Sequence, residues 1–279
     1  MRSVGLVLGV ALIVSLAHAQ APVVNAGGVV NNADYAVQGV APGSIIAIFG
    51  TNLASNLAIG DTVPLSNSLD TLTSVTFNGL PAGVYFVSPN QIDAQLPWES
   101  VPGGTMSVVV TTHAGTSATQ TVNVLAAQPG IFTVNQTGAG QAIATDNFDS
   151  AISAPTGSIT GVNTHPFSIG TQGQNGHALI LWCTGLGAVT PAIADGANSY
   201  NADGSLTLRN TVAQPPSDLV VMVGGVQAQV LFSGLAPAFV SENQVDVLLG
   251  PGTPTGSAVP VQITVNGVTT NQVTIAVGP

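Results

Sequence analysis

Carboxylate side chains at four positions could do acid and base chemistry. Glu99 and Glu242 are the only glutamates, and Asp93 and Asp246 lie near them in the sequence. Glycoside hydrolysis needs two carboxyl groups about 5 to 9.5 Å apart. Glu242 and Asp246 are about 13 Å apart if they lie along one strand at ~3.3 Å per residue, which is too far. Asp93 and Glu99 are separated by a Pro-Trp bend, so their spacing neither excludes nor supports such a pair.

Other catalytic patterns are absent from the sequence. It has no GxSxG, HExxH or CxxC motif, and no phosphate-binding loop with a lysine. Beyond residue 19 the histidines are His113, His165 and His177, whose scattered positions are typical of structural histidines. Cys183 is the single cysteine and lies in an apolar run, which predicts a buried, inert thiol and leaves an intermolecular disulfide as the alternative. We therefore predict no enzymatic activity, no catalytic or cofactor-binding residues and no cofactor.

One loop carries oxygen ligands of the type that Ca²⁺ prefers. The stretch DGANSYNADGS supplies side-chain oxygens from Asp195, Asn198, Asn201, Asp203 and Ser205. Its spacing does not match an EF-hand, and Asp-Gly pairs are ordinary turn sequences. The sequence assigns no metal site and leaves calcium binding by residues 195–205 open.

The elements that must position these residues are strands. Charged residues make up only 5% of the chain and hydrophobic residues 45%. Short runs rich in Val, Ile and Thr alternate with clusters of Gly, Pro and Asn, a pattern typical of an all-β sandwich or barrel. No helical periodicity appears after the first 19 residues.

A repeated string indicates a duplication. FVSPNQIDAQLPW at residues 86–98 returns as FVSENQVDVLLGP at residues 239–251. Side chains alternate between the faces of a strand, so each copy predicts one strand with a core face and an outer face. The predicted core residues are Ile92, Ala94, Leu96, Val245, Val247 and Leu249. The predicted outer residues are Gln91, Asp93, Gln95, Gln244 and Asp246, which either belong to a solvated sheet face or form a duplicated binding site.

The blocks around each copy follow the same order, which predicts two immunoglobulin-sized β-sandwiches at residues 41–127 and 173–279. Residues 20–40 form an N-terminal extended segment that pairs within its own unit or with a neighbouring chain. Residues 128–172 form a connecting hairpin segment that packs across both sandwiches. The predicted fold is thus all-β, with two tandem immunoglobulin-like sandwiches joined by a β-hairpin segment.

Residues 1–19 have the features of a secretory signal peptide: Arg2, an apolar run and a small-x-small cleavage signal. Its removal leaves Arg209 as the only Lys or Arg beside 12 carboxylates. Such a surface repels phosphate backbones and anionic lipid, so neither nucleic-acid binding nor membrane insertion after cleavage is expected. The predicted location is extracellular or periplasmic.

Several strings together resemble a known family. VAPGSIIAIFGTNLA, VTFNGLPAGVYFVSPNQIDAQLPWE, QPGIFT, TGLGAVTP and VMVGGVQAQVLFSGLAPAFVSENQVDV are similar to the secreted acidobacterial family called the Solibacter uncharacterized C-terminal domain. The resemblance covers about residues 24–278, and each half is similar to IPT/TIG modules. It implies an immunoglobulin-like fold at the cell exterior and carries no catalytic residues.

The function expected from these observations is a secreted, non-catalytic interaction or structural module that acts in adhesion or self-association. Its partner is a protein or glycan at the cell exterior, or a second copy of itself, because no lysine guards the sheet edges against pairing. A carbohydrate-binding module is the alternative, with Trp98 and Tyr200 as the best-placed aromatic residues. A hydrolase with a site assembled from loops is the second alternative.

Overall fold

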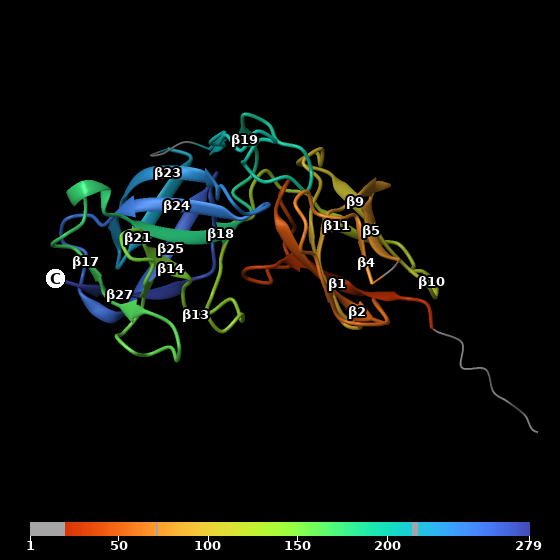
Figure 1. Ribbon diagram of the computed structural model, residues 1–279, viewed down its shortest axis with the longest axis horizontal. Helices are drawn as coiled ribbons and strands as arrows, with labels where there is room; N and C mark the ends of the chain where they lie inside the picture. The colour runs from red at the N-terminus through yellow and green to blue at the C-terminus, as the bar shows by residue number, and fades with distance from the viewer. Residues whose placement is uncertain (1–19, 71, 214–216) are drawn as a thin grey trace, which may run out of the picture.

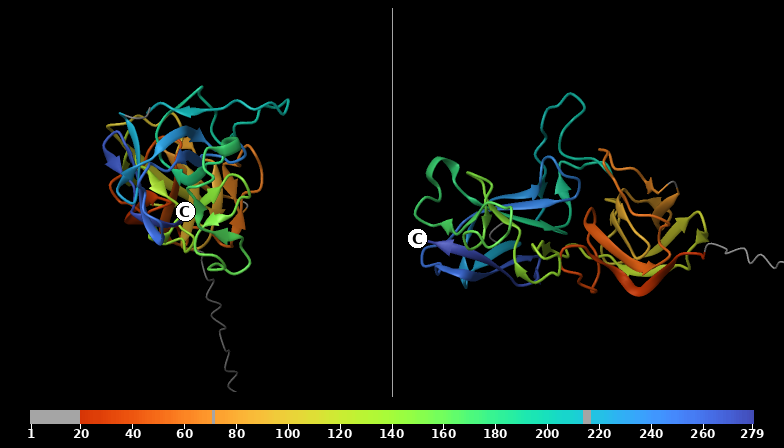
Figure 2. Two further views of the ribbon diagram at one scale, coloured as in Figure 1. Left: turned by 90° about the vertical axis from the view of Figure 1, so that its left-hand side faces the viewer. Right: turned by 60° about the horizontal axis from the view of Figure 1, so that its bottom comes forward.

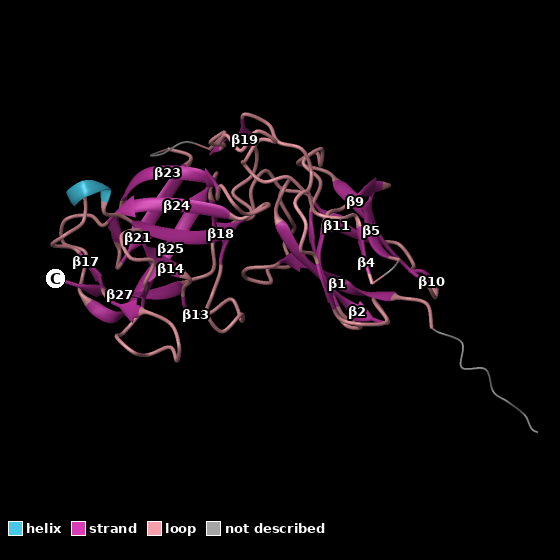
Figure 3. Ribbon diagram, in the orientation of Figure 1, coloured by secondary structure: helices cyan, strands magenta, loops and turns pink. Residues whose placement is uncertain are grey.

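The computed structural model describes residues 20–70, 72–213 and 217–279, and in these it is built almost entirely of β-strands (Figure 3). Their one helix is a short 3-10 turn, η1 (Gln174–Gly176). The predicted signal peptide at residues 1–19 lies outside the described residues. Among those that are described, no helix combines the length and apolarity needed to cross a membrane. Figure 1 shows two sandwiches side by side along the long axis.

The first sandwich packs a five-stranded sheet against a six-stranded sheet. The first sheet has the order β1 (Val23–Asn31), β2 (Ile45–Thr51), β8 (Gln91–Gln95), β7 (Val84–Val87) and β3 (Ala58–Ile59). The second has the order β10 (Gly115–Thr116), β9 (Thr105–Thr112), β5 (Thr73–Phe77) and β4 (Ser68–Leu69), with β11 (Gln120–Asn123) on β9 and β6 (Leu80–Pro81) on β5. Alternate apolar residues of both sheets, such as Ile48 and Val75, meet in one buried core.

The second sandwich packs a nine-stranded sheet against a seven-stranded sheet. The third sheet has the order β16 (Thr164–His165), β15 (Ile152–Ser153), β14 (Ala144–Asp146), β18 (Leu179–Thr184), β24 (Asn243–Leu248), β23 (Gln229–Leu235), β20 (Asn210–Thr211) and β19 (Val189–Thr190), with β12 (Gly130–Ile131) on β18. The fourth has the order β13 (Gly140–Gln141), β27 (Val273–Gly278), β25 (Gly256–Val265), β21 (Leu219–Val223) and β22 (Val226–Gln227), with β17 (Phe167–Ser168) on β27 and β26 (Val268–Thr269) on β25. Its core joins residues of both sheets, such as Leu181 and Ile263. The all-β, immunoglobulin-like fold class predicted from the sequence is therefore confirmed.

The segment expected to connect the sandwiches has a different position from the predicted one. Its hairpin is present, because β14 pairs with β15 through Thr145 and Ile152. However, β14 also pairs along β18, and Phe167 of the same segment is fully buried in the second core. The strands of residues 128–172 thus extend the second sandwich, because they contribute apolar residues to that core. The carbonyls of Gln128 and Gln136 in the same segment accept hydrogen bonds from Asn31 and Tyr35 of the first sandwich. The N-terminal segment likewise pairs within its own chain, through β1 and β2.

Buried polar contacts join the two sandwiches at their junction. Gln95 accepts a hydrogen bond from the backbone N–H of Gly196 and donates one to the hydroxyl of Ser241, both at 2.5 Å. The backbone N–H of Ile45 donates to the hydroxyl of Thr184 at 2.9 Å. Gln95 is only 1% exposed. The right-hand view of Figure 2 shows the two sandwiches in contact with each other end to end.

The described part of the long excursion, residues 188–213, lies over the same junction (Figure 1). The backbone carbonyl of Gly196 accepts a hydrogen bond from the N–H of Leu65 in the first sandwich at 2.8 Å. Arg209 donates from its guanidinium to the carbonyl of Thr207 at 2.9 Å and to that of Ser199 at 3.4 Å. The excursion thus joins the two sandwiches through Gly196, while Arg209 holds the excursion together internally. Its sequence alone did not indicate this role.

Candidate functional site

The repeated string forms equivalent strands, β8 and β24, in the two sandwiches. The residues predicted to face the cores are all buried: Ile92, Ala94, Leu96, Val245, Val247 and Leu249. Asp93 and Asp246 lie on the opposite faces and are partly exposed. The predicted register is thus confirmed, with one correction. Gln95 belongs to the outer set but is buried by the second sandwich instead of being solvated.

Each copy carries a hydrogen-bonded pair of a glutamine and an aspartate on its outer face. Gln91 donates from Nε2 to Asp93 at 2.8 Å, and Gln244 donates from Nε2 to Asp246 at 3.1 Å. Burial raises the pKa of Asp93 to about 6, against the lowering effect of hydrogen bonds from Gln91 and Asn32. Burial also raises the pKa of Asp246 to about 6, against the hydrogen bond from Gln244. Both carboxyl groups are therefore partly desolvated and remain ionised at neutral pH.

Aromatic side chains flank the pair of the first sandwich. Phe49 lies directly across from Gln91 on β2, and Phe86 lies across from Asp93 on β7. Side chains directly opposite each other on neighbouring strands lie on one face of the sheet. The ring of Tyr35 packs against Phe49 with centroids 5.9 Å apart. We call these five residues the first patch.

The second sandwich repeats this arrangement at the same register. Trp182 lies across from Gln244 on β18, and Phe232 lies across from Asp246 on β23. A third ring, Phe239, packs edge-on against Trp182 with centroids 6.2 Å apart. We call these five residues the second patch.

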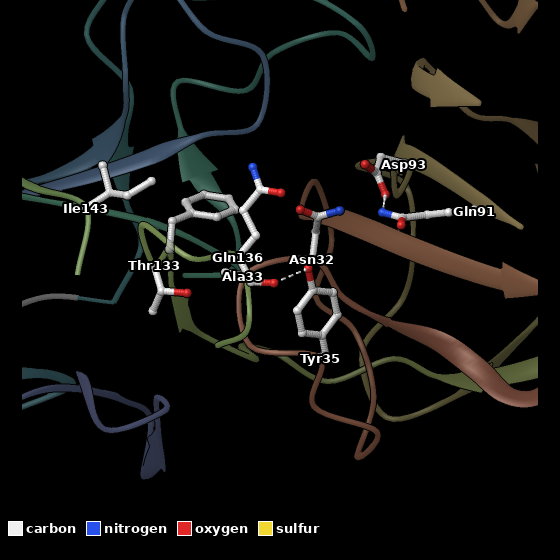
Figure 4. A pocket seen from close by; sticks show the side chains of 9 residues that line it. Asn32, Ala33, Tyr35, Gln91, Asp93, Thr133, Gln136 and Ile143 are labelled. Carbon is white, nitrogen blue, oxygen red and sulfur yellow. Dashed lines mark hydrogen bonds between the residues drawn. The ribbon is translucent and has the colours of Figure 1, made fainter. Parts of the chain in front are cut away.

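A pocket of about 270 Å³ lies beside the first patch, between the two sandwiches. Figure 4 shows its side chains, with Asp93 and Gln91 at one end and Ile143 at the other. The phenol hydroxyl of Tyr35 crosses the junction and donates to the carbonyl of Gln136 at 3.0 Å. The lining residues are Asn32, Ala33, Tyr35, Gln91 and Asp93 from the first sandwich, and Phe132, Thr133, Gln136 and Ile143 from the second.

The far wall of this pocket adjoins the second patch. The backbone N–H of Phe132 donates to the carbonyl of Trp182 at 3.1 Å, and the N–H of Trp182 donates to the carbonyl of Ile143 at 3.2 Å. Because Ile143 and Trp182 are cross-strand neighbours, their side chains share one sheet face. The first patch, the pocket and the second patch thus follow one another across the junction.

This arrangement suits recognition of a polar ligand with apolar faces. The rings offer flat apolar surfaces, while the ionised aspartates and the glutamine and asparagine amides offer hydrogen-bond acceptors and donors. A few polar groups among apolar side chains is the usual composition of a small-ligand site.

The carboxylates considered for hydrolysis have other partners. Glu99 is hydrogen-bonded to Asp195, which also accepts the backbone N–H of Trp98 at 2.9 Å. Burial is the main cause that raises the pKa of Asp195, and the Glu99 carboxylate raises it further. Glu242 lies near Tyr85 at the junction: burial raises the pKa of the Tyr85 hydroxyl, and the Glu242 charge raises it further. These partners give no support to either pair considered for hydrolysis, Asp93 with Glu99 or Asp246 with Glu242.

The side-chain oxygens of the loop at residues 195–205 are used in local hydrogen bonds. Asp203 accepts from the backbone N–H and hydroxyl of Ser205 at 2.9 and 2.6 Å, and Asn198 accepts the N–H of Tyr200 at 3.1 Å. Asn201 donates to the hydroxyl of Ser205 at 2.9 Å. These contacts are the turn-forming interactions typical of Asx residues, with Asp195 turned toward the junction.

The two aromatic residues selected from the sequence lie outside both patches. Trp98 covers Gly43 and lines a second cavity of about 380 Å³, with its indole N–H buried and lacking a hydrogen-bond partner. Tyr200 is 47% exposed on the excursion. Cys183 is fully buried, as predicted, and burial raises the pKa of its thiol. The sequence analysis missed the patch aromatics, although the alignment of Phe49 with Trp182 and of Phe86 with Phe232 could have indicated them.

The histidines occupy unequal settings. His113 is exposed in the first sandwich. His165 contacts Asp149 at 2.9 Å, and His177 contacts Asp146 at 2.7 Å. Sequence analysis treated the histidines as scattered, because 11 residues separate His165 from His177 in the chain.

Comparison with known families finds a domain match in part of the chain. Residues 37–145 match the IPT/TIG domain. This match begins before β2 and ends in β14, so it includes every strand of the first sandwich except β1, together with β12, β13 and the start of β14. A search of curated proteins finds no match.

Solved structures provide distant neighbours. A gamma-CGTase from Alkalophilic bacillus clarkii is 13% identical with a TM-score of 0.27, covering 91% of this chain and 25% of that chain. Domains 5-6 of the S-layer protein SbsC are 12% identical with a TM-score of 0.26, covering 92% and 98%. SGBP-B of the mixed-linkage glucan utilization locus of Bacteroides ovatus, solved with a heptasaccharide, is 11% identical with a TM-score of 0.30, covering 86% and 43%. This chain thus spans 25% of the first neighbour's length, and similarities this low carry no argument about ligand or activity.

Proposed function

We propose that this protein is a secreted, non-catalytic binding protein whose ligand is a glycan at the cell exterior. One observation carries the proposal. A hydrogen-bonded glutamine and aspartate flanked by two aromatic side chains occurs at the same register in both sandwiches. Core packing needs only the inward residues of β8 and β24, so these outward side chains are free to serve recognition.

The chemistry of the face fits a sugar chain. Pyranose rings present apolar C–H faces to aromatic rings and hydroxyl groups to carboxylates and amides. The pocket of about 270 Å³ is slightly smaller than the range of about 300 to 1,000 Å³ typical of small-ligand pockets, so we assign it no more than one sugar unit. The two patches on either side would take neighbouring units of the same chain.

Other features support the location and the class of partner. The features of residues 1–19 and the resemblance to the Solibacter uncharacterized C-terminal domain favour secretion. The acidic composition disfavours nucleic acid and anionic lipid. The N-terminal strand β1 is paired with β2 of the same chain. It is therefore occupied and does not favour self-association with a neighbouring copy through this strand.

Calorimetric titration with neutral gluco-, xylo- and manno-oligosaccharides tests the proposal. We expect binding to one of these series, weakened about tenfold or more by Trp182→Ala and by Phe86→Ala. Tyr200→Ala is the matched control, because it removes an exposed aromatic ring outside both patches and should leave the affinity unchanged. Asp93→Asn and Asp246→Asn test the two copies separately.

The pH dependence gives a second measurement. Ionised carboxylates are the stronger acceptors for sugar hydroxyls. Since the pKa of Asp93 and of Asp246 is about 6, affinity should be highest above pH 7 and fall as the pH drops through 6. Absence of binding to every series would refute the glycan proposal, and release of reducing ends during the titration would refute the non-catalytic one.

A further inference from the structure

A cluster of acidic and imidazole side chains in the second sandwich contains no residue of either patch. Asp146 ends β14, Asp149 lies in the turn that follows, and His165 is in β16. One ligand atom of each of these three residues lies within 4.8 Å of the corresponding atoms of the other two. Two sequence segments, the end of β14 with its following turn and β16, thus converge on one small volume.

The ring of His165 is oriented by an outer hydrogen bond. Its Nδ1 lies 3.0 Å from the carbonyl of Pro166, which can only accept, so Nδ1 carries the proton. Its Nε2 then points at Asp149, 2.9 Å from a carboxylate oxygen. A backbone carbonyl on one ring nitrogen is the usual way in which proteins hold the other nitrogen toward a metal ion.

Both carboxylates are held in place by backbone groups. Asp146 accepts the N–H of Phe148 at 2.9 Å, and Asp149 accepts the N–H of Ala151 at 3.0 Å, each through Oδ1. The second oxygen of each group lies beside a histidine, Oδ2 of Asp146 beside His177 and Oδ2 of Asp149 beside His165. Two carboxylates this close repel each other, and a bound cation would remove that repulsion.

His177 supports the cluster from the buried side. Its Nε2 lies 2.7 Å from a carboxylate oxygen of Asp146, and its ring packs against Phe167 with centroids 5.1 Å apart. The side chains of His177 and Asp146 are 10% and 5% exposed, whereas those of His165 and Asp149 are 35% and 38% exposed. The cluster therefore has a rigid inner wall and an open outer side through which an ion can enter.

We propose that Asp146, Asp149 and His165 bind a divalent transition-metal ion of the Zn²⁺ type, with His177 as a positioning residue for Asp146. An imidazole nitrogen among the ligands favours Zn²⁺ over Ca²⁺ and Mg²⁺, which prefer oxygen donors throughout. Three protein ligands leave a coordination position for water on the exposed side. The ion would tie the turn between β14 and β15 to β16, and this site is independent of the proposed glycan face.

Calorimetric titration of Zn²⁺ into metal-stripped protein, purified without a polyhistidine tag, tests the site. We expect one equivalent to bind and the melting temperature to rise, because the ion binds only the folded chain. The Co²⁺ complex should show visible absorption bands with an intensity typical of four or five ligands. Asp149→Asn and His165→Gln should weaken binding by more than the tenfold to hundredfold that loss of an outer partner costs.

Two controls make the outcome decisive. His113→Gln changes an exposed histidine of the first sandwich, and Asp203→Asn changes the loop at residues 195–205; both should leave Zn²⁺ affinity unchanged. His177→Ala should weaken binding about tenfold while His177→Gln, which retains an N–H donor, restores most of it. Zn²⁺ affinity equal in wild type and in the Asp149→Asn, His165→Gln double variant would overturn the site. Binding of Ca²⁺ but not Zn²⁺ would overturn the assigned metal class.

Discussion

Glu242 is a carboxyl group enclosed at the junction between the two sandwiches. Burial raises its pKa to about 7. Its charge in turn raises the pKa of Tyr85 and of the Cys183 thiol, though burial is the larger cause for both. A group whose pKa is higher in the folded chain than in the unfolded chain stabilises the fold most at low pH. This contribution is present below about pH 4.5 and is lost as the pH rises through 7.

Replacing Glu242 with glutamine should therefore change stability in a pH-dependent way. The free energy of unfolding of Glu242→Gln, relative to wild type, should be higher at pH 8 than at pH 4.5 by up to about 3 kcal/mol. Comparing two pH values cancels the cost of burying the amide. Urea unfolding at both pH values measures this difference. The control is Val240→Ala, a non-ionisable change in the same loop, which should change the free energy of unfolding by the same amount at both pH values. The same pH-independent change for Glu242→Gln would contradict the prediction.

At the scale of elements, a glycine turn and a tryptophan fix how β2 meets β8. Gly43 has φ +69, and a Cβ at this position would overlap the ring of Trp98. The backbone N–H of Gly43 donates to the carbonyl of Leu96 at 3.0 Å. Glycine is therefore required at position 43 for two reasons: the positive φ, and the space that the Trp98 ring occupies where a Cβ would be.

Alanine substitutions can separate these two requirements. Gly79 also has positive φ, +82, but a Cβ there would meet no atom within 4 Å. Gly79→Ala should cost about 1 to 2 kcal/mol of unfolding free energy from backbone strain alone. Gly43→Ala should cost a further 1 to 3 kcal/mol, roughly, from overlap. In a Trp98→Ala background this further cost should disappear, and its persistence would show that the ring is not its cause.

At the scale of the whole molecule, the angle between the sandwiches depends on a polar junction. Gln95 contacts Gly196 and Ser241, whereas the equivalent residue of the second copy is Leu248. The two copies of the repeat thus differ at the position where one sandwich meets the other. Fixing this angle also fixes the pocket between the patches.

Replacing Gln95 with leucine, the residue that the second copy has, should loosen the junction. It leaves the N–H of Gly196 and the hydroxyl of Ser241 buried without partners, at a cost of about 2 to 4 kcal/mol. Solution X-ray scattering should show a broader range of inter-sandwich angles, and unfolding should begin at lower denaturant concentration. Gln229→Leu, at an exposed glutamine in a strand, is the control. An unchanged scattering curve would indicate that other contacts set the angle.

The sequence by itself determined the fold class and the register of the repeated strands. Alternating side chains are a local property of a strand, so the burial of Ile92 and Val245 and the outward position of Asp93 and Asp246 could be read from their spacing. The sequence pattern also predicted the lack of α-helices among the residues that the structure describes, where the only helix is the short 3-10 turn η1. These predictions succeeded because each depends on neighbours within a few residues.

Only the tertiary structure decided which side chains meet. Gln95 was predicted to be solvated because its own strand exposes that face, and the second sandwich covers it. His165 and Asp149 lie 16 residues apart, and only the pairing of β15 with β16 brings them together. The pocket likewise joins Asp93 to Phe132 across the junction. Contacts between distant segments depend on how sheets pair and pack, and no local periodicity in the sequence encodes that geometry.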